Sequence, residues 1–265
     1  MQRRKEKAAH PTQILEHSFP EQRAFIEDPS KLKTLLCTRR AAKSFSACLH
    51  LFRDCLENPN VSSLYLALTR VSVKKILWKD VIKVINRTYK LGCELKEGPL
   101  EVHFPNGSIM YLGGADNDPK EMEKLLGQKY YSVAVDEASM WRQDLYELIY
   151  SVLKPAVADY QGTIILLGTP SNYTTGLFYD LTISEAPLVT GWKYFTWDTH
   201  CNPYVKKQWT AEIAQLQKDV PGIEDTARFQ QMYLKKWVID TSAMIYKYTH
   251  ANVIDVLPDS KYSYI

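Results

Sequence analysis

The chain has 265 residues, of which 45% are hydrophobic and 24% are charged, and this composition is typical of a globular protein with one large domain, or one domain with a small appendage. No apolar run approaches the roughly 20 residues of a membrane span, and no apolar segment follows the charged N-terminus, which argues against membrane and secreted proteins. The five cysteines form no C-x-x-C pair, which argues against a disulfide framework and a zinc site, and the net charge of +3 does not by itself indicate nucleic-acid binding. We therefore expect an intracellular protein with free thiols.

The N-terminal part of the chain alternates between charged, helical and apolar segments. Residues 1–20 predict a charged, weakly structured leader that ends at a proline, and residues 21–26 predict a short helix. An apolar strand over 34–37 follows, then a tight basic turn, and then a helix that starts at Lys43 and runs to about residue 56. This order of strand, turn and helix is the local structure of a phosphate-binding loop.

The turn also carries part of the sequence motif of such a loop. The stretch reads TLLCTRRAAKSFS over residues 34–46, with Lys43 and Ser44 where the motif G-x-x-x-x-G-K-[ST] has its last two positions. The chain has Cys37 and Ala42 where that motif has glycine. On these residues alone, a plain strand–turn–helix with a surface lysine explains the stretch equally well.

The chemistry of the turn suits a triphosphate. Backbone N–H groups at a helix start are unpaired and carry the positive end of the helix dipole, so they can hold phosphate beside a small residue such as Ala42. Lys43 would then reach the β- and γ-phosphates, and the Ser44 hydroxyl would complete a magnesium shell. Arg39 and Arg40 would add charge beside the same phosphates.

Strand-length and helical segments continue to alternate beyond this loop. Further apolar strands are predicted over 63–68, 131–135 and 163–167. Helices are predicted over 72–87, 119–126 and 143–158, and a hairpin with an Asn-Gly turn joins 101–104 to 108–111. Two helical segments, 202–218 and 224–235, predict a small helical subdomain packed on the sheet. The alternation predicts an α/β fold with a mostly parallel sheet, whose ligands bind at the carboxyl ends of the strands.

Two acids follow the strand over 131–135 directly. Asp136 could hold magnesium, and Glu137 could orient and deprotonate the water that attacks a γ-phosphate. Alternatively, both acids only cap the next helix. Combined with the loop at Lys43, the pair favours an ATP-hydrolysing site, in which Thr169 after the next strand would sense the γ-phosphate. We expect Lys43 and the two acids to converge on one triphosphate at one edge of the sheet.

The order of these motifs resembles the ATPase domain of the large terminase subunit of tailed phages, the motor that packages viral DNA. The resemblance runs from about residue 20 to 247. Gln22 matches a glutamine that contacts adenine in that family, RRAAKS over 39–44 is similar to its first motif, and VDE over 135–137 is similar to its second, whose Glu is the catalytic base. Gly168-Thr169-Pro170, followed by GLFY over 176–179, resembles the motif that couples hydrolysis to movement.

The resemblance implies an additional-strand P-loop ATPase that uses ATP and Mg²⁺. The expected nucleotide ligands are Gln22, Thr38, Arg39, Arg40, Ala41, Ala42, Lys43, Ser44 and Phe45; the metal ligands are Ser44 and Asp136; the catalytic residues are Glu137, Arg39, Arg40 and Thr169. Some members of the family also carry an arginine proposed to reach the nucleotide of a neighbouring subunit; Leu126 stands at that position in this chain, and Arg142 or Lys129 could replace it.

The resemblance also implies the organisation and setting of the protein. We expect a leader over 1–20, an ATPase core over 21–200, a helical lid over 201–250 and, over 251–265, a linker toward a nuclease domain that the chain lacks, hence no nuclease activity. The implied partners are double-stranded DNA, the portal protein, the small terminase subunit and further copies in a ring on the portal, with no membrane. The protein would work in the host cytoplasm and transiently at the procapsid portal. A helicase-like translocase and a catalytically weak nucleotide-binding assembly module are the alternatives.

Overall fold

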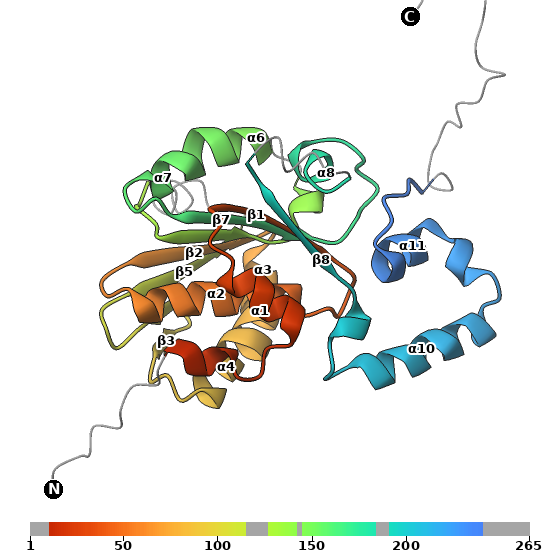
Figure 1. The fold of residues 1–265 in the computed structure, drawn as a ribbon, viewed down its shortest axis with the longest axis horizontal. Helices are drawn as coiled ribbons and strands as arrows, with labels where there is room; N and C mark the ends of the chain where they lie inside the picture. The colour runs from red at the N-terminus through yellow and green to blue at the C-terminus, as the bar shows by residue number, and fades with distance from the viewer. Residues whose placement is uncertain (1–10, 115–126, 142–144, 184–190, 241–265) are drawn as a thin grey trace, which may run out of the picture.

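A single eight-stranded sheet organises the chain in the computed structural model, which describes residues 11–114, 127–141, 145–183 and 191–240. The strand order is β3-β4-β5-β2-β6-β7-β1-β8, and helices cover both faces of the sheet (Figure 1). The strands are β1 Leu32–Cys37, β2 Ser62–Ala67, β3 Glu94–Lys96, β4 Glu101–His103, β5 Ile109–Gly114, β6 Ser132–Val135, β7 Thr163–Gly168 and β8 Lys193–Trp197.

The sheet is parallel from β5 through β8, as the alternation of elements predicts. β7 lies between β1 and β6, so an additional strand separates the strand before the basic turn from the strand before the acids. The register keeps the carboxyl ends of these strands level, with Leu36 opposite Gly168 and Val135 opposite Leu166. The loops that follow these three strands therefore meet at one edge.

The antiparallel edge of the sheet begins with the predicted hairpin. β4 and β5 pair antiparallel, and Gly107 takes φ +87° in the turn, where an added Cβ would lie 2.3 Å from the Asn60 side chain. The hairpin prediction is confirmed. The short strands β3 and β8 were not predicted; β3 has no buried residue and β8 has one, so neither shows the continuous apolar run of a strand buried on both faces.

Helices on the two faces bury two separate apolar clusters. One face carries α1 Pro20–Glu27, α2 Lys43–Glu57, α3 Arg70–Ser72, the π-helical segment η2 Val73–Ile82 and α4 Lys83–Thr88. The other face carries α6 Leu145–Glu147, the π-helical segment η4 Leu148–Leu153, α7 Lys154–Ala158 and α8 Leu177–Asp180. Short 3-10 turns are η1 Pro11–Leu15, η3 Ala138–Met140, η5 Thr199–Cys201 and η6 Ile223–Asp225.

Helices over 72–87 and 143–158 were predicted from their apolar spacing, and both regions are helical wherever the structure describes them. Each contains a π-helical segment, which a 3.6-residue period of apolar residues does not predict. The predicted helix over 119–126 lies outside the described residues.

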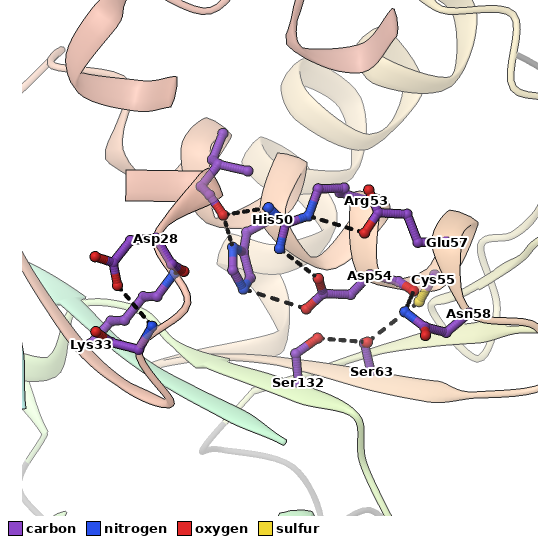
Figure 2. Close-up of polar contacts among 12 residues, drawn as sticks. Asp28, Lys33, His50, Arg53, Asp54, Cys55, Glu57, Asn58, Ser63 and Ser132 are labelled. Atoms are coloured by element: carbon purple, nitrogen blue, oxygen red, sulfur yellow. Dashed lines mark hydrogen bonds and ion pairs between the residues drawn. The ribbon is translucent and has the colours of Figure 1, made fainter. Parts of the chain in front are cut away.

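Buried polar contacts tie the end of α1 to both β1 and α2, away from the loops described above (Figure 2). Lys33 on β1 is fully buried and donates to the carbonyl oxygens of Phe25, at 2.9 Å, and Asp28, at 2.5 Å. Burial lowers the pKa of Lys33 to about 8 and that of His50 to about 4. His50 is therefore neutral near pH 7, so its contact with Asp54, 3.4 Å away, is not an ion pair.

The C-terminal helical pair, α10 Lys206–Asp219 and α11 Ala227–Leu234, extends to one side of the sheet (Figure 1). Trp209, Tyr233 and Phe229 form a column of stacked rings with centroid distances of 4.9 and 4.5 Å. This column holds the two helices together. Among the described residues, no helix has the length and apolarity that a membrane crossing requires.

Candidate active site

The loop between β1 and α2 has an unusual backbone for its sequence. Arg40 and Ala42 have φ values of 65° and 63°, in the left-handed region that favours glycine. Ala42 is the N-cap of α2 and makes no side-chain cap hydrogen bond. The alanine that replaces the motif glycine thus adopts a glycine-like conformation, and the first-turn N–H groups of α2 remain available for an anion.

Carbonyl groups of this loop are fixed by the last residue of β8 and by the segment after it. Thr199 Oγ1 donates to the Arg39 carbonyl oxygen at 2.5 Å, and Trp197 Nε1 donates to that of Ala41 at 2.7 Å. Asn202 Nδ2 donates to the Arg40 carbonyl oxygen at 3.1 Å. These bonds turn the carbonyl oxygens away from the inside of the loop. Carbonyl oxygens that pointed into the loop would repel a phosphate.

A cavity of about 420 Å³ opens over the loop. Its lining includes Arg39 and Lys43 from the loop and α2, Glu137 after β6, and Thr169 after β7. Arg228, on α11, completes the wall. Three cations therefore face one carboxylate around this cavity, which suits a ligand with several negative charges.

Asp136 is the centre of the polar contacts beside this cavity. It is 7% exposed; its Oδ2 accepts from Ser44 Oγ at 2.7 Å and from the Tyr65 hydroxyl at 2.5 Å, and its Oδ1 accepts from the Glu137 N–H at 2.7 Å. Burial raises the pKa of Tyr65 well above its usual value, so the phenol keeps its proton and acts as the donor. Ser44 and Asp136 thus meet, as the sequence predicts.

This pair of oxygen ligands fits a magnesium ion. Mg²⁺ in nucleotide sites takes one or two protein oxygens and completes its shell with phosphate oxygens and water. A buried carboxylate whose oxygen lies 2.7 Å from a serine hydroxyl provides that set. Among the described residues no group of three or more His, Cys, Asp or Glu could hold a metal, so phosphate would have to supply the remaining ligands.

Glu137 is held in a conformation that non-glycine residues rarely adopt, with φ 53° and ψ 37°. The left-handed backbone directs its side chain into the cavity that Lys43 also lines. Lost solvation, together with the charge of Asp136, raises the pKa of the Glu137 carboxyl above its usual value, while Lys43 opposes the shift. A carboxylate of raised basicity that faces solvent in a cationic cavity can accept a proton from water.

Hydrogen bonds connect the loop after β7 to the turn after Glu137 and to α11. Ser139 Oγ donates to the Thr169 carbonyl oxygen at 2.6 Å, and Ser171 Oγ donates to the Ser139 carbonyl oxygen at 2.9 Å. Gln231 on α11, which is 6% exposed, donates to Asn172 Oδ1 at 2.7 Å. The Thr169 loop therefore contacts both the turn after the acids and the C-terminal helical pair.

Gln22 lies at a second, apolar cavity of about 490 Å³. Ala42 and Phe45 from the loop and α2 line this cavity, together with Phe19 and Tyr204. Gln22 is 3% exposed, and its Nε2 donates to Ser46 Oγ at 2.9 Å. An apolar space next to Ala42 is large enough to receive a nucleobase whose phosphates lie against the loop.

Three predicted ligands of the nucleotide, Thr38, Arg40 and Ala41, line none of the cavities around the loop. Thr38 is buried, and its hydroxyl lies 2.7 Å from that of Thr199. Ala41 is 1% exposed, and Arg40 is exposed but is not among the residues that line the cavity. The backbone of these residues shapes the loop, while their side chains lie elsewhere.

Sequence reasoning missed Tyr65 and Arg228. Tyr65 stands in an apolar strand like any core aromatic, and Arg228 has no motif around it, so neither residue gave a signal that could be read before the fold was known. Of the two replacements for the trans-acting arginine, Lys129 pairs with Asp159, and Arg142 lies outside the described residues, as does Leu126.

No protein-family model matches this chain, and no curated protein sequence does either. Among solved structures, the chain is similar to the large terminase ATPase domain of Thermus phage P74-26, with 18% identity and a TM-score of 0.60 over 82% of this chain and 93% of that one. It is also similar to the large terminase of bacteriophage HK97, with 12% identity and a TM-score of 0.64 over 86% of this chain and 55% of that one.

The large terminase of the thermophilic bacteriophage D6E in complex with ATP-gamma-S matches with 14% identity and a TM-score of 0.58 over 83% of this chain and 53% of that one. The chain thus spans about half the length of the D6E and HK97 proteins. At these identities the likeness concerns the fold. The chain has the fold of these phage large terminase ATPase domains, a mostly parallel sheet flanked by helices, which confirms the predicted α/β fold class.

Proposed function

We propose that this protein is the Mg²⁺-dependent ATPase motor of a viral large terminase, which moves double-stranded DNA into a procapsid. The observation that carries the proposal is the convergence of Lys43, Ser44, Asp136 and Glu137, from two segments of the chain, at one edge of the sheet. The terminase fold and the ATP-gamma-S complex of the D6E protein support the same reading.

In the proposed reaction, the loop and its cations hold the triphosphate. The N–H groups at the start of α2 and the Lys43 ammonium bind the phosphates, while Arg39 and Arg228 balance the charge that develops during transfer. Glu137 takes a proton from a water molecule while the oxygen of that water bonds to the γ-phosphorus. The bond to the bridging oxygen breaks, and ADP leaves with that electron pair.

Magnesium would be held by Ser44 and Asp136 and would neutralise phosphate charge. Tyr65 would act as a positioning residue, because its hydroxyl keeps the Asp136 carboxylate in place without facing the nucleotide. Thr169 would pass the state of the γ-phosphate to the C-terminal helical pair, the proposed lid over 201–250, through the contact between Asn172 and Gln231. The apolar cavity at Gln22 would hold adenine.

The proposal includes the setting of a packaging motor. The chain would act as a ring of copies on the portal protein, with the small terminase subunit and DNA as further partners, and Arg40 or a residue of a neighbouring copy would add charge to the site. The work would take place in the host cytoplasm and at the portal of the procapsid.

The test is a comparison of Glu137→Gln with the wild type. The variant should keep ATP affinity within about threefold, while its turnover should fall by about 10²–10⁴-fold because the general base is lost. Glu212→Gln, an exposed position on α10, removes the same charge outside the cavity and should leave turnover unchanged. Full turnover in Glu137→Gln would refute the assignment.

Two further measurements separate the alternatives. Strand separation on a forked duplex would identify a helicase-like translocase instead. The absence of magnesium-dependent phosphate release from the wild type at high protein concentration would identify a nucleotide-binding assembly module.

A further inference from the structure

One helix, together with the turn that follows it, holds an unusual share of the positive charge of this chain. Residues 70–90 contain seven of the 33 basic residues and one of the 30 acidic residues, so this segment has a formal charge of +6. Since the whole chain has a charge of +3, the remaining residues together have a charge of −3. The net charge of +3 is therefore the sum of one strongly basic segment and a slightly acidic remainder.

Four of these cations form a line on the solvent side of the helix, here called the basic stripe: Lys75, Lys79, Lys83 and Arg87. They are spaced four residues apart and all are exposed, whereas the opposite side of the helix is buried in the core. The stripe spans three four-residue steps along one side of the helix.

The basic stripe is unfavourable for the isolated helix. Like charges four residues apart repel each other and destabilise a helix. Among the described residues, only Lys83 of the stripe has an ion pair, with Glu97 at 3.2 Å, and this pair is exposed. A polyanion on the stripe would remove the repulsion that the fold leaves in place.

We infer that the basic stripe binds the phosphate backbone of double-stranded DNA. The charge density favours a duplex over a folded acidic protein: double-stranded DNA carries one negative charge for about every 1.7 Å of its axis, so it offers a phosphate to each cation of the stripe. The inference rests on the proposed function for the choice of DNA as the partner, but it does not require ATP hydrolysis.

The same helix contacts the candidate active site from its other side. Val73, Leu77 and Val81 line a cavity of about 100 Å³ together with Ser44 and Asp136. All three apolar residues lie in η2, and π-helical segments are rare and frequent at functional sites. DNA on the outer side of this helix and the proposed metal ligands on its inner side are thus separated only by the helix and its inward-facing apolar side chains, a route by which DNA can change the rate of hydrolysis.

The test uses the whole chain and the triple variant K75Q/K79Q/R87Q, which leaves the ion pair of Lys83 intact. The control is K206Q/K207Q/K218Q, which removes three exposed cations from α10. Binding of a fluorescent blunt duplex is followed by anisotropy over a range of salt concentrations. The stripe variant should bind at least tenfold more weakly, equally on two unrelated sequences, and its log–log salt slope should fall by about 3.

Three results would overturn the inference. No duplex binding by the wild type at low salt, or an equal loss in the α10 control, overturns the inference. Polyglutamate that competes as well as DNA at equal charge concentration also overturns it and points to an acidic protein. The melting temperature of the stripe variant should match or exceed that of the wild type, which excludes misfolding as the cause.

ATP hydrolysis without DNA should be unchanged in the stripe variant, while its stimulation by DNA should be lost. If the wild type binds DNA through the stripe but hydrolyses no ATP, the proposed function fails and the inference stands. If it hydrolyses ATP and the stripe variant binds DNA normally, the inference fails and the proposed function stands.

Discussion

Replacing Tyr65 with Phe removes one hydroxyl from the centre of the candidate site. In the wild type this hydroxyl donates to Asp136 Oδ2 at 2.5 Å, and both residues are buried. The substitution keeps the ring, so packing on β2 is preserved, and Asp136 keeps its bonds from Ser44 and from the N–H of Glu137. The lost interaction is therefore a single hydrogen bond to a charged acceptor.

A hydrogen bond to a charged group contributes about 1.5–3 kcal/mol to stability. Because two other donors remain on Asp136, we expect a loss of about 2 kcal/mol, equivalent to a fall in melting temperature of about 4–8 °C for a chain of this size. Urea denaturation measures the loss as a shift of the midpoint at constant m-value.

A second readout distinguishes positioning from packing. Since Tyr65 holds a proposed magnesium ligand, the Mg²⁺ concentration for half-maximal ATPase activity should rise several-fold in Tyr65→Phe, while the KM for ATP changes little. Tyr233→Phe, in the ring column of the C-terminal helical pair, removes a phenol hydroxyl that is not among the donors to Asp136 and serves as the control. If Tyr65→Phe loses no more stability than this control, the Tyr65–Asp136 bond does not exist in solution.

Three further predictions follow from the same structure. The raised pKa of Glu137 places the acidic limb of the kcat/KM profile above pH 4.5, because the base must be deprotonated to act; a midpoint at or below 4.5 would contradict its role. His50, with its pKa lowered to about 4, binds no proton between pH 6.5 and 4 in the folded state, whereas the unfolded state does. The contribution of His50 to the free energy of unfolding should therefore be complete above pH 6.5 and should fall by up to about 3 kcal/mol toward pH 4. In denaturation experiments, His50→Gln should flatten this dependence of stability on pH. Ala42→Gly relieves a left-handed alanine and should stabilise the protein by about 1 kcal/mol; a lower melting temperature would show that the loop has another conformation in solution.

The sequence by itself determined the central part of the fold. Continuous apolar runs at β2, β6 and β7 mark strands buried on both faces, and the Asn-Gly turn marks the hairpin, because these patterns reflect local backbone chemistry and burial. The placement of Lys43 after β1 and of Asp136 and Glu137 after β6 was also predictable, since the carboxyl ends of parallel strands meet at one edge.

Only the tertiary structure decided which other residues complete the site. Tyr65 and Arg228 come from a strand and a helix with no motif of their own, and they reach the site because β2 neighbours β6 and because α11 lies over the cavity. The loop that contains the left-handed Ala42 is likewise held by contacts from distant segments, such as the bond from Trp197 to the Ala41 carbonyl oxygen. Patterns along the chain report local periodicity and chemistry, whereas proximity between segments far apart in sequence arises only when the sheet assembles.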